Sequence, residues 1–250
     1  MRARSGHQHW WPGETPFEVC VGAILTQNTA WSNVERAIAN LKAARVLEPK
    51  KLFALPEAKL AQLIRPAGYF NVKARRLRSF LRVLVEQFDG DLKKLFAGET
   101  SVVRERLLAV NGIGPETADS MLLYAGGHHS FVIDAYTKRI FSRHGWGQSG
   151  KRPASTSFRR GRAVAASEGG KAESGKNREA SYNELKSLCE LALGQKSGVA
   201  RQSAAKAAAA RLDYWQDYHA QLVMIGKHFC RTRSPRCDEC PLKPLLPQLK

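Results

Sequence analysis

The stretch "NGIGPETAD", residues 111–119, is a turn whose composition suits the binding of an anion. Gly112 and Gly114 can adopt positive φ angles and let another backbone approach closely. Pro115 suits the first turn of a following helix, where its missing N–H costs nothing. The free N–H groups of the turn and of that helix would then face an anion such as a DNA phosphate, and would hold it without reading sequence. A G-x-G pair alone, however, is usually only a turn.

Asp134 stands directly after the apolar run of "FVIDAYTKRIF" and before a stretch with a helical pattern. An aspartate at such a place commonly caps a helix by accepting a backbone N–H. Spacing alone favours that structural role. Only the combination of Asp134 with the turn at 111–119 favours a chemical one.

The charge of the chain indicates a polyanionic partner. Its 250 residues hold 40 Lys+Arg and 22 Asp+Glu, which gives a formal net charge of +18 and a sequence pI of about 10.0. Lysines and arginines placed on phosphates release condensed counterions, so such an excess favours nucleic acid. The alternative is a basic protein with no such partner, because charge predicts association and not fold.

The compartment follows from what the sequence lacks. No apolar run approaches the roughly 20 residues of a membrane span, and the start "MRARSGHQHWWPGE" lacks the apolar core of a signal peptide. The five cysteines are an odd number, and three of them cluster near the C-terminus, unlike a secreted disulfide framework. We therefore expect a cytoplasmic, nucleoid-associated monomer that does not enter a membrane.

Helical patterns dominate and predict an all-α fold. In "KARRLRSFLRVLVEQF", Leu77, Leu81 and Leu84 lie on one apolar stripe. Only "SFVID", residues 130–134, resembles a strand. Residues 147–181 are rich in Gly, Ser and basic residues and poor in large apolar ones, so we expect a disordered basic insertion that adds non-specific contact with DNA.

The pair "GIGPETAD" and, about 20 residues later, "VIDAYTKR" resembles the helix-hairpin-helix DNA glycosylase family, which includes endonuclease III. "FEVCVGAILTQNTAWSNVERAI" and "IRPAGYFNVKARRL" look like two further blocks of that family. The resemblance implies two helical halves flanking a DNA-binding cleft. One half is the helical barrel with the hairpin, residues 23–130, and the other combines residues 1–22 with 131–250. A damaged nucleotide of double-stranded DNA would flip out between them.

The resemblance also implies roles for single residues. Asp134 matches the catalytic aspartate, whose carboxylate would stabilise positive charge on the sugar and orient or deprotonate the attacking water. Gln27 and Asn28 match residues that enter the gap left by the flipped nucleotide, although capping of a helix end is an equal alternative. The hairpin residues expected to contact DNA are Gly112, Gly114 and Thr117.

Glu116 is an informative departure from the family pattern. In the bifunctional members a lysine stands two residues after the hairpin glycines, and its amine forms a Schiff base that leads to strand cleavage. Here Glu116 holds that position, counted from Gly114, and Lys138 does not match the motif. A carboxylate cannot form an imine, so we expect a monofunctional enzyme without lysine-based lyase activity.

The start "HWWPGETPFEV" resembles the 3-methyladenine DNA glycosylase subgroup of the endonuclease III superfamily. That likeness makes Trp10, Trp11 and Trp31 candidates for an aromatic pocket, because indole faces attract the positive charge of an alkylated purine. Packing in the core is the alternative. The subgroup can also carry a modified lysine within a stretch like "YHAQLV", where this chain has Gln221.

The C-terminal cysteines, Cys230, Cys237 and Cys240, are spaced C-x6-C-x2-C and resemble the [4Fe–4S] loop of endonuclease III. The fourth cysteine would fall on Leu246, and cluster ligation normally needs four thiolates. Three interpretations stay open: an incompletely ligated cluster, a zinc site completed by His228, or a loop without metal. Cys20 and Cys189 lie in apolar helical runs and fit core thiols.

The leading function is therefore base excision repair of alkylated purines. One alternative keeps the fold but acts on oxidised pyrimidines or mismatches. A second is a non-catalytic DNA-binding protein that uses the hairpin only as a phosphate clamp. Asp134 argues against the second alternative, because simple binding needs no acid facing phosphates.

Overall fold

The computed structural model describes residues 1–11, 13–147, 180–194 and 204–246. The predicted all-α fold is confirmed, since none of these residues forms a strand. The elements in chain order are α1 (Arg2–Ser5), α2 (Pro16–Leu25), α3 (Trp31–Ala43), α4 (Pro49–Ala54), α5 (Glu57–Leu63), η1 (Arg65–Ala67), α6 (Phe70–Phe88), α7 (Leu92–Leu95), α8 (Thr100–Leu108), α9 (Pro115–Tyr124), α10 (Ala135–His144), α11 (Tyr182–Gly194), α12 (Ala204–His228), η2 (Cys237–Glu239) and η3 (Lys243–Leu245). The proposed insertion at 147–181 lies almost wholly outside the described residues.

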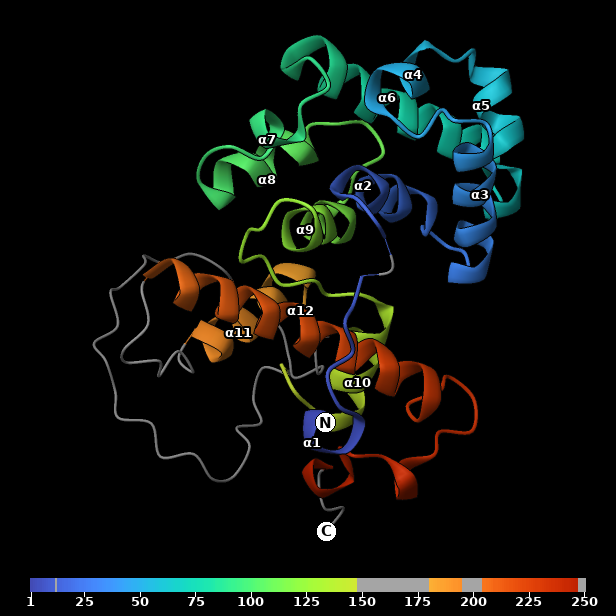
Figure 1. Ribbon diagram of the computed structural model, residues 1–250. Coiled ribbons are helices and arrows are strands. Elements are labelled where there is room, and N and C mark those ends of the chain that lie inside the picture. The colour runs from blue at the N-terminus through green and yellow to red at the C-terminus, as the bar shows by residue number, and fades with distance from the viewer. Residues whose placement is uncertain (12, 148–179, 195–203, 247–250) are drawn as a thin grey trace, which may run out of the picture.

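Two helical layers meet at α9. In Figure 1, α2 to α8 gather above α9, while α10 to α12 lie below it together with α1. The helix α9 contacts α2 and α8 on one side and α12 on the other. Within the described residues, no helix is long and apolar enough to cross a membrane.

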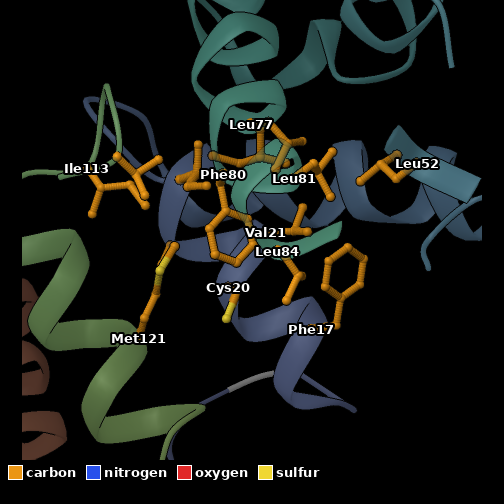
Figure 2. Packing of buried hydrophobic residues seen from close by; sticks show 14 of the residues in the cluster. Phe17, Cys20, Val21, Leu52, Leu77, Phe80, Leu81, Leu84, Ile113 and Met121 are labelled. Atoms are coloured by element: carbon orange, nitrogen blue, oxygen red, sulfur yellow. The ribbon is translucent and has the colours of Figure 1, made fainter. Parts of the chain in front are cut away.

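Each layer has its own group of buried apolar side chains. The upper group joins α2, α6 and α9, and Figure 2 shows Phe17 and Val21 packed with Leu77 and Leu84, as the apolar stripe predicts. The lower group joins the segment after α9 with α10, α11 and α12. The upper group begins at Phe17, inside the range 1–22 that the resemblance places with the other half.

The strand-like residues 130–134 form a buried extended segment instead of a strand. Phe131, Val132 and Ile133 are almost fully buried. Side chains replace the partner strand: the Phe131 N–H donates to the Glu190 carboxylate over 2.8 Å, and the Ile133 N–H lies 3.4 Å from the Tyr182 hydroxyl. This segment leads directly to Asp134 and thereby fixes its place.

A buried carboxylate ties the two layers together. Asp119, on α9, is fully buried and accepts two hydrogen bonds from the Arg104 guanidinium, of 2.8 and 3.0 Å. It also accepts from the Ser130 hydroxyl at 2.6 Å and from the Tyr182 hydroxyl at 2.8 Å. The Lys186 ammonium lies 3.6 Å away. Because a buried charge needs such partners, Asp119 holds α8, α9 and α11 in one arrangement.

Candidate active site

The hairpin between α8 and α9 is held from inside the protein. Gly112 has φ 90°, and a Cβ there would lie 2.2 Å from the Arg76 side chain, so only glycine fits. Gly114 has φ −92° and therefore does not use the positive φ that the sequence allowed. A Cβ on Gly114 would meet no protein atom within 4 Å, so packing inside the protein does not require this glycine. Its exposed N-cap position leaves the hairpin open to an approaching backbone.

Gln27 couples the loop after α2 to this hairpin. Its Nε2 donates to the Gly112 carbonyl at 3.1 Å and to the Thr117 hydroxyl at 3.0 Å, and Arg76 donates to its Oε1. The same loop is anchored by Lys73, which is buried and donates to the Leu25 and Ala67 carbonyls at 2.8 Å. Burial, with the nearby Arg76, lowers the pKa of Lys73 to about 8. Gln27 and Thr117 are thus engaged within the protein.

A cavity of about 650 Å³ lies where the two layers meet. Its walls come from the N-terminal segment, the loop before α3, and α9, α10 and α12. Six of the residues singled out in the sequence line it together: Trp10, Trp11, Asn28, Trp31, Glu116 and Asp134. The other four predicted DNA contacts are not among its walls: Gln27, Gly112, Gly114 and Thr117.

The tryptophans form one aromatic wall. Trp11 meets Trp31 edge to face, with ring centroids 5.4 Å apart and an interplanar angle of 86°, and meets Trp10 at 6.2 Å and 73°. All three indole N–H groups are buried without a hydrogen-bond partner in the described chain. Unpaired buried donors are uncommon in folded proteins. The three side chains line the cavity together, so this wall offers mainly aromatic surface to it.

The N-terminal segment is pinned by α12, which explains how Trp10 and Trp11 reach the wall. The Gln8 N–H donates to the buried Asp217 carboxylate over 2.8 Å. Gln221, one turn further along α12, donates to the Gly6 carbonyl at 2.6 Å. Gln221 is buried and is not among the cavity walls, so the position compared with a modified lysine serves this anchoring contact.

Asp134 has a structural contact and a free edge. Its Oδ1 accepts the Thr137 N–H at 2.7 Å and caps α10, as the spacing predicts. Its Oδ2 lies 3.8 Å from Nε2 of His219, a buried residue of α12 that also lines the cavity. Nδ1 of the same ring lies 2.6 Å from the Tyr124 hydroxyl. Capping therefore fixes the carboxylate without using the edge that faces the cavity.

Glu116 faces the same space as Asp134. Its side chain is exposed on the cavity wall at the first turn of α9. Desolvation, together with the nearby Asp134 carboxylate, raises the pKa of Glu116 to about 7, although Lys138 opposes the shift. A carboxyl group that is part protonated near neutral pH thus lines the cavity together with Asp134.

The chain is similar in sequence to known proteins. Residues 21–164 match the model of the HhH-GPD superfamily of base excision DNA repair proteins. A provisionally named DNA repair glycosylase of Methanocaldococcus jannaschii is 41% identical over 240 residues, which cover 95% of this chain and 88% of that protein. The chain belongs to the HhH-GPD superfamily. It is a base excision repair DNA glycosylase, which hydrolyses N-glycosidic bonds.

Solved structures of the superfamily share the fold. The 3-methyladenine DNA glycosylase of H. pylori, bound to 1,N6-ethenoadenine, matches with a TM-score of 0.59 and 25% identity over 87% of each chain. A non-covalent endonuclease III–DNA complex matches with a TM-score of 0.61 and 20% identity, over 93% of this chain and 83% of that one. The second likeness concerns the fold alone.

The cysteine loop of this glycosylase surrounds a second, much smaller space of about 20 Å³, enough for about one water molecule. Cys230, Cys237 and Cys240 line it together with Leu246, at the place of the missing ligand. The Arg143 guanidinium lies 3.2 Å from the Cys230 sulfur and donates to it. The protein supplies three thiols and a hydrocarbon where a cluster needs four thiolates, so the ligand set is incomplete.

His228 and the two remaining cysteines lie apart from this space. His228 is exposed and does not line the space between the thiols. No group of three or more His, Cys, Asp or Glu in the described ranges is arranged to hold a single metal ion. Cys20 and Cys189 are buried in the two apolar groups, as their helical runs predict, and burial raises the pKa of the Cys189 thiol to about 12.

Two neighbours of Asp134, Tyr124 and His219, were not identified from the sequence. His219 stands in the "YHAQLV" stretch, two residues before Gln221, but a lone histidine on an apolar helix is most often a core residue. The signal that could identify it is its helical register: Val223 and Gly226, at spacings of four and seven, also line the cavity.

Proposed function

We propose that this glycosylase flips alkylated purines such as 3-methyladenine out of double-stranded DNA, releases them and leaves an abasic site. The observation that carries the proposal is the convergence of Trp10, Trp11 and Trp31 with Asp134 on one cavity. Its volume of about 650 Å³ is in the ordinary range for small-ligand sites. The H. pylori neighbour with this fold is itself a 3-methyladenine DNA glycosylase.

The chemistry suits such a wall. An alkylated purine carries positive charge, which indole faces attract, and its glycosidic bond is already weakened. The enzyme then needs little activation of the leaving group. The charge that develops on the sugar is stabilised by the fixed Asp134 carboxylate, which also takes the proton of the attacking water.

The DNA duplex would lie along the hairpin. The exposed N-terminus of α9 offers backbone N–H groups to a phosphate, and Arg139, Lys227 and Arg231 add positive charge to the cavity wall. Asn28, exposed at the same wall with φ 54°, is placed to enter the gap of the flipped nucleotide. Gln27 would act indirectly, by holding Gly112 and Thr117 in place.

The reaction would stop at the abasic site. Glu116 stands at the position of the lyase lysine, and neither of its protonation states provides an amine that could attack C1′. Lys138 lies on α10, with its ammonium 5.7 Å from the centroid of the Tyr182 ring.

Replacing Trp31 by alanine should lower the rate of 3-methyladenine release about 10- to 30-fold, because a desolvated cation–π contact contributes roughly 2 kcal/mol. Affinity for an undamaged duplex should change less than threefold. Single-turnover release and a binding titration measure the two effects.

Leu191→Ala is the matched control, since Leu191 is 66% exposed on α11 and does not line the cavity. This control should behave as wild type in both measurements. Equal losses of release and of undamaged-duplex affinity in Trp31→Ala would show that Trp31 supports the fold and not base recognition.

A substrate panel tests the choice of base. The rate of base release should be highest for a duplex with a single 3-methyladenine analogue, lower for an oxidised pyrimidine and lowest for a mismatch. The alkylated purine should be released at least about tenfold faster than the other two. Preferential release of an oxidised pyrimidine would favour the alternative function on this fold. Binding of all duplexes without release from any would favour the non-catalytic interpretation.

For the cysteine loop, we propose that the loss of a fourth thiolate at Leu246 prevents a complete, stable [4Fe–4S] cluster. Freshly purified protein should then show little absorbance near 400 nm (a region typical of such clusters) and substoichiometric iron and zinc. Leu246→Cys should raise both the iron content and the absorbance. A full complement of iron in the wild-type protein would contradict this proposal, and so would an unchanged iron content in Leu246→Cys.

A further inference from the structure

The second residue that faces the cavity edge of Asp134 is His219. Its side chain is 4% exposed, and its Nε2 is buried with no hydrogen-bond partner among the described residues. A buried polar atom without a partner needs a reason. This one lies 3.8 Å from Asp134 Oδ2, on a ring that lines the cavity.

The protonation of the ring follows from its neighbours. Burial lowers the pKa of His219, although the Asp134 carboxylate opposes the shift, so the ring is neutral near pH 7 and carries one N–H. Burial also raises the pKa of Tyr124 well above its usual value, so its hydroxyl keeps its proton. That hydroxyl lies 2.6 Å from His219 Nδ1 and 3.2 Å from the Gln216 carbonyl.

Two arrangements satisfy these contacts. If Nδ1 carries the hydrogen, Tyr124 donates to Gln216 and the Nε2 lone pair faces a carboxylate, which is repulsive. If Tyr124 donates to Nδ1, the hydrogen is on Nε2 and points toward the Asp134 carboxylate, which is attractive. Electrostatics therefore selects the tautomer with the hydrogen on Nε2.

The separation of 3.8 Å is too long for a direct hydrogen bond. An oxygen atom placed about 2.8 Å from both atoms would bridge them with hydrogen bonds of ordinary length. We propose that His219 Nε2–H and Asp134 Oδ2 together hold the water that attacks the sugar, with His219 as a positioning residue whose tautomer is fixed by Tyr124.

The step balances. The water accepts the His219 N–H with one lone pair and donates one hydrogen to Asp134. Its second lone pair forms the bond to C1′ while the electrons of the N-glycosidic bond leave with the base. The water proton passes to the Asp134 carboxylate. This inference rests on the proposed base release, but its tautomer can be tested without substrate.

Nitrogen-15 NMR of histidine-labelled wild-type protein gives the first test. The expected signals for His219 are a protonated Nε2 and an unprotonated Nδ1, assigned by their loss in His219→Gln. A protonated Nδ1 with a bare Nε2 would overturn the proposal, whatever the substrate proves to be.

Two substitutions give the kinetic test. The amide of His219→Gln can return an N–H near the Nε2 position, whereas that of His219→Asn reaches only toward Tyr124. At saturating enzyme, His219→Asn should lower the rate of base release about 100-fold, and His219→Gln should lower it less than about tenfold. The affinity for duplex DNA should be unchanged in both variants. Equal rates in the two variants, or losses matched by equal losses of affinity, would overturn the proposal.

Tyr124→Phe keeps the test decisive if the His219 variants do not fold. It removes the hydroxyl that fixes the tautomer and should lower the rate about tenfold at unchanged duplex affinity. An unchanged rate would overturn the proposal. The wild-type rate measured in parallel reports the proposed function, and the ratio of variant to wild type reports the role of His219.

Discussion

Asp134→Asn should lower the rate of base release by about three orders of magnitude, because it removes both the charge that stabilises the developing cation and the acceptor of the water proton. Asparagine has the same shape and also caps helices well, so α10 and the affinity for duplex DNA should be preserved. Single-turnover release and a duplex titration, measured on the same preparation, test the two parts of this expectation.

The control separates catalysis from capping. Asp89→Asn makes the same chemical change at an exposed carboxylate that is absent from the cavity walls, and should leave the rate unaltered. Asp134→Ala also removes the helix cap. It should lower the rate of base release and, in addition, lower the free energy of unfolding by about 1 kcal/mol. Wild-type turnover in Asp134→Asn would mean that Asp134 is only a helix cap.

Asp119→Ala should lower the free energy of unfolding by about 3 to 5 kcal/mol, because it leaves the Arg104 and Lys186 charges without their shared partner in a buried place. The Ser130 and Tyr182 hydroxyls lose their acceptor as well. Denaturant titration followed by circular dichroism measures the change. Asp119→Asn keeps one carbonyl oxygen that can accept from one of the two hydroxyls, so it should be destabilised less than the alanine variant.

Asp238→Ala serves as the comparison. Asp238 pairs with Lys243 at 2.8 Å, but its side chain is 94% exposed, where ion pairs contribute little. The unfolding midpoint of Asp238→Ala should match that of the wild type. If Asp119→Ala were as stable as Asp238→Ala, the buried network would not be what holds α8, α9 and α11 together.

The local parts of the site are those that the sequence predicts best. The turn at 111–119 and the cap at Asp134 depend on residues within a few positions of each other, so glycine, proline and aspartate chemistry indicates them directly. The convergence of Trp10 and Trp31 with Asp134 has no such local cause. It could be expected only through the resemblance to a family whose fold brings these segments together.

The roles of Gln27, His219 and Gln221 could not be predicted from the sequence, because their partners lie far away along the chain. Gln27 is part of the family's "LTQNT" block, yet its side chain holds Gly112 and Thr117, which follow it by 85 and 90 positions. His219 meets Tyr124 over 95 positions. Gln221 also faces away from the cavity, because the helical register of α12 turns His219 and not Gln221 toward it.

We propose that this chain releases an alkylated base and leaves the strand intact. The direct measurement uses a duplex with one 3-methyladenine analogue and a labelled strand, analysed before and after alkali and in the presence of borohydride. We expect release of the base, strand breaks only after alkali, and no trapped covalent adduct, because Glu116 cannot form an imine. Strand cleavage without alkali, together with a borohydride-trapped adduct, would contradict it.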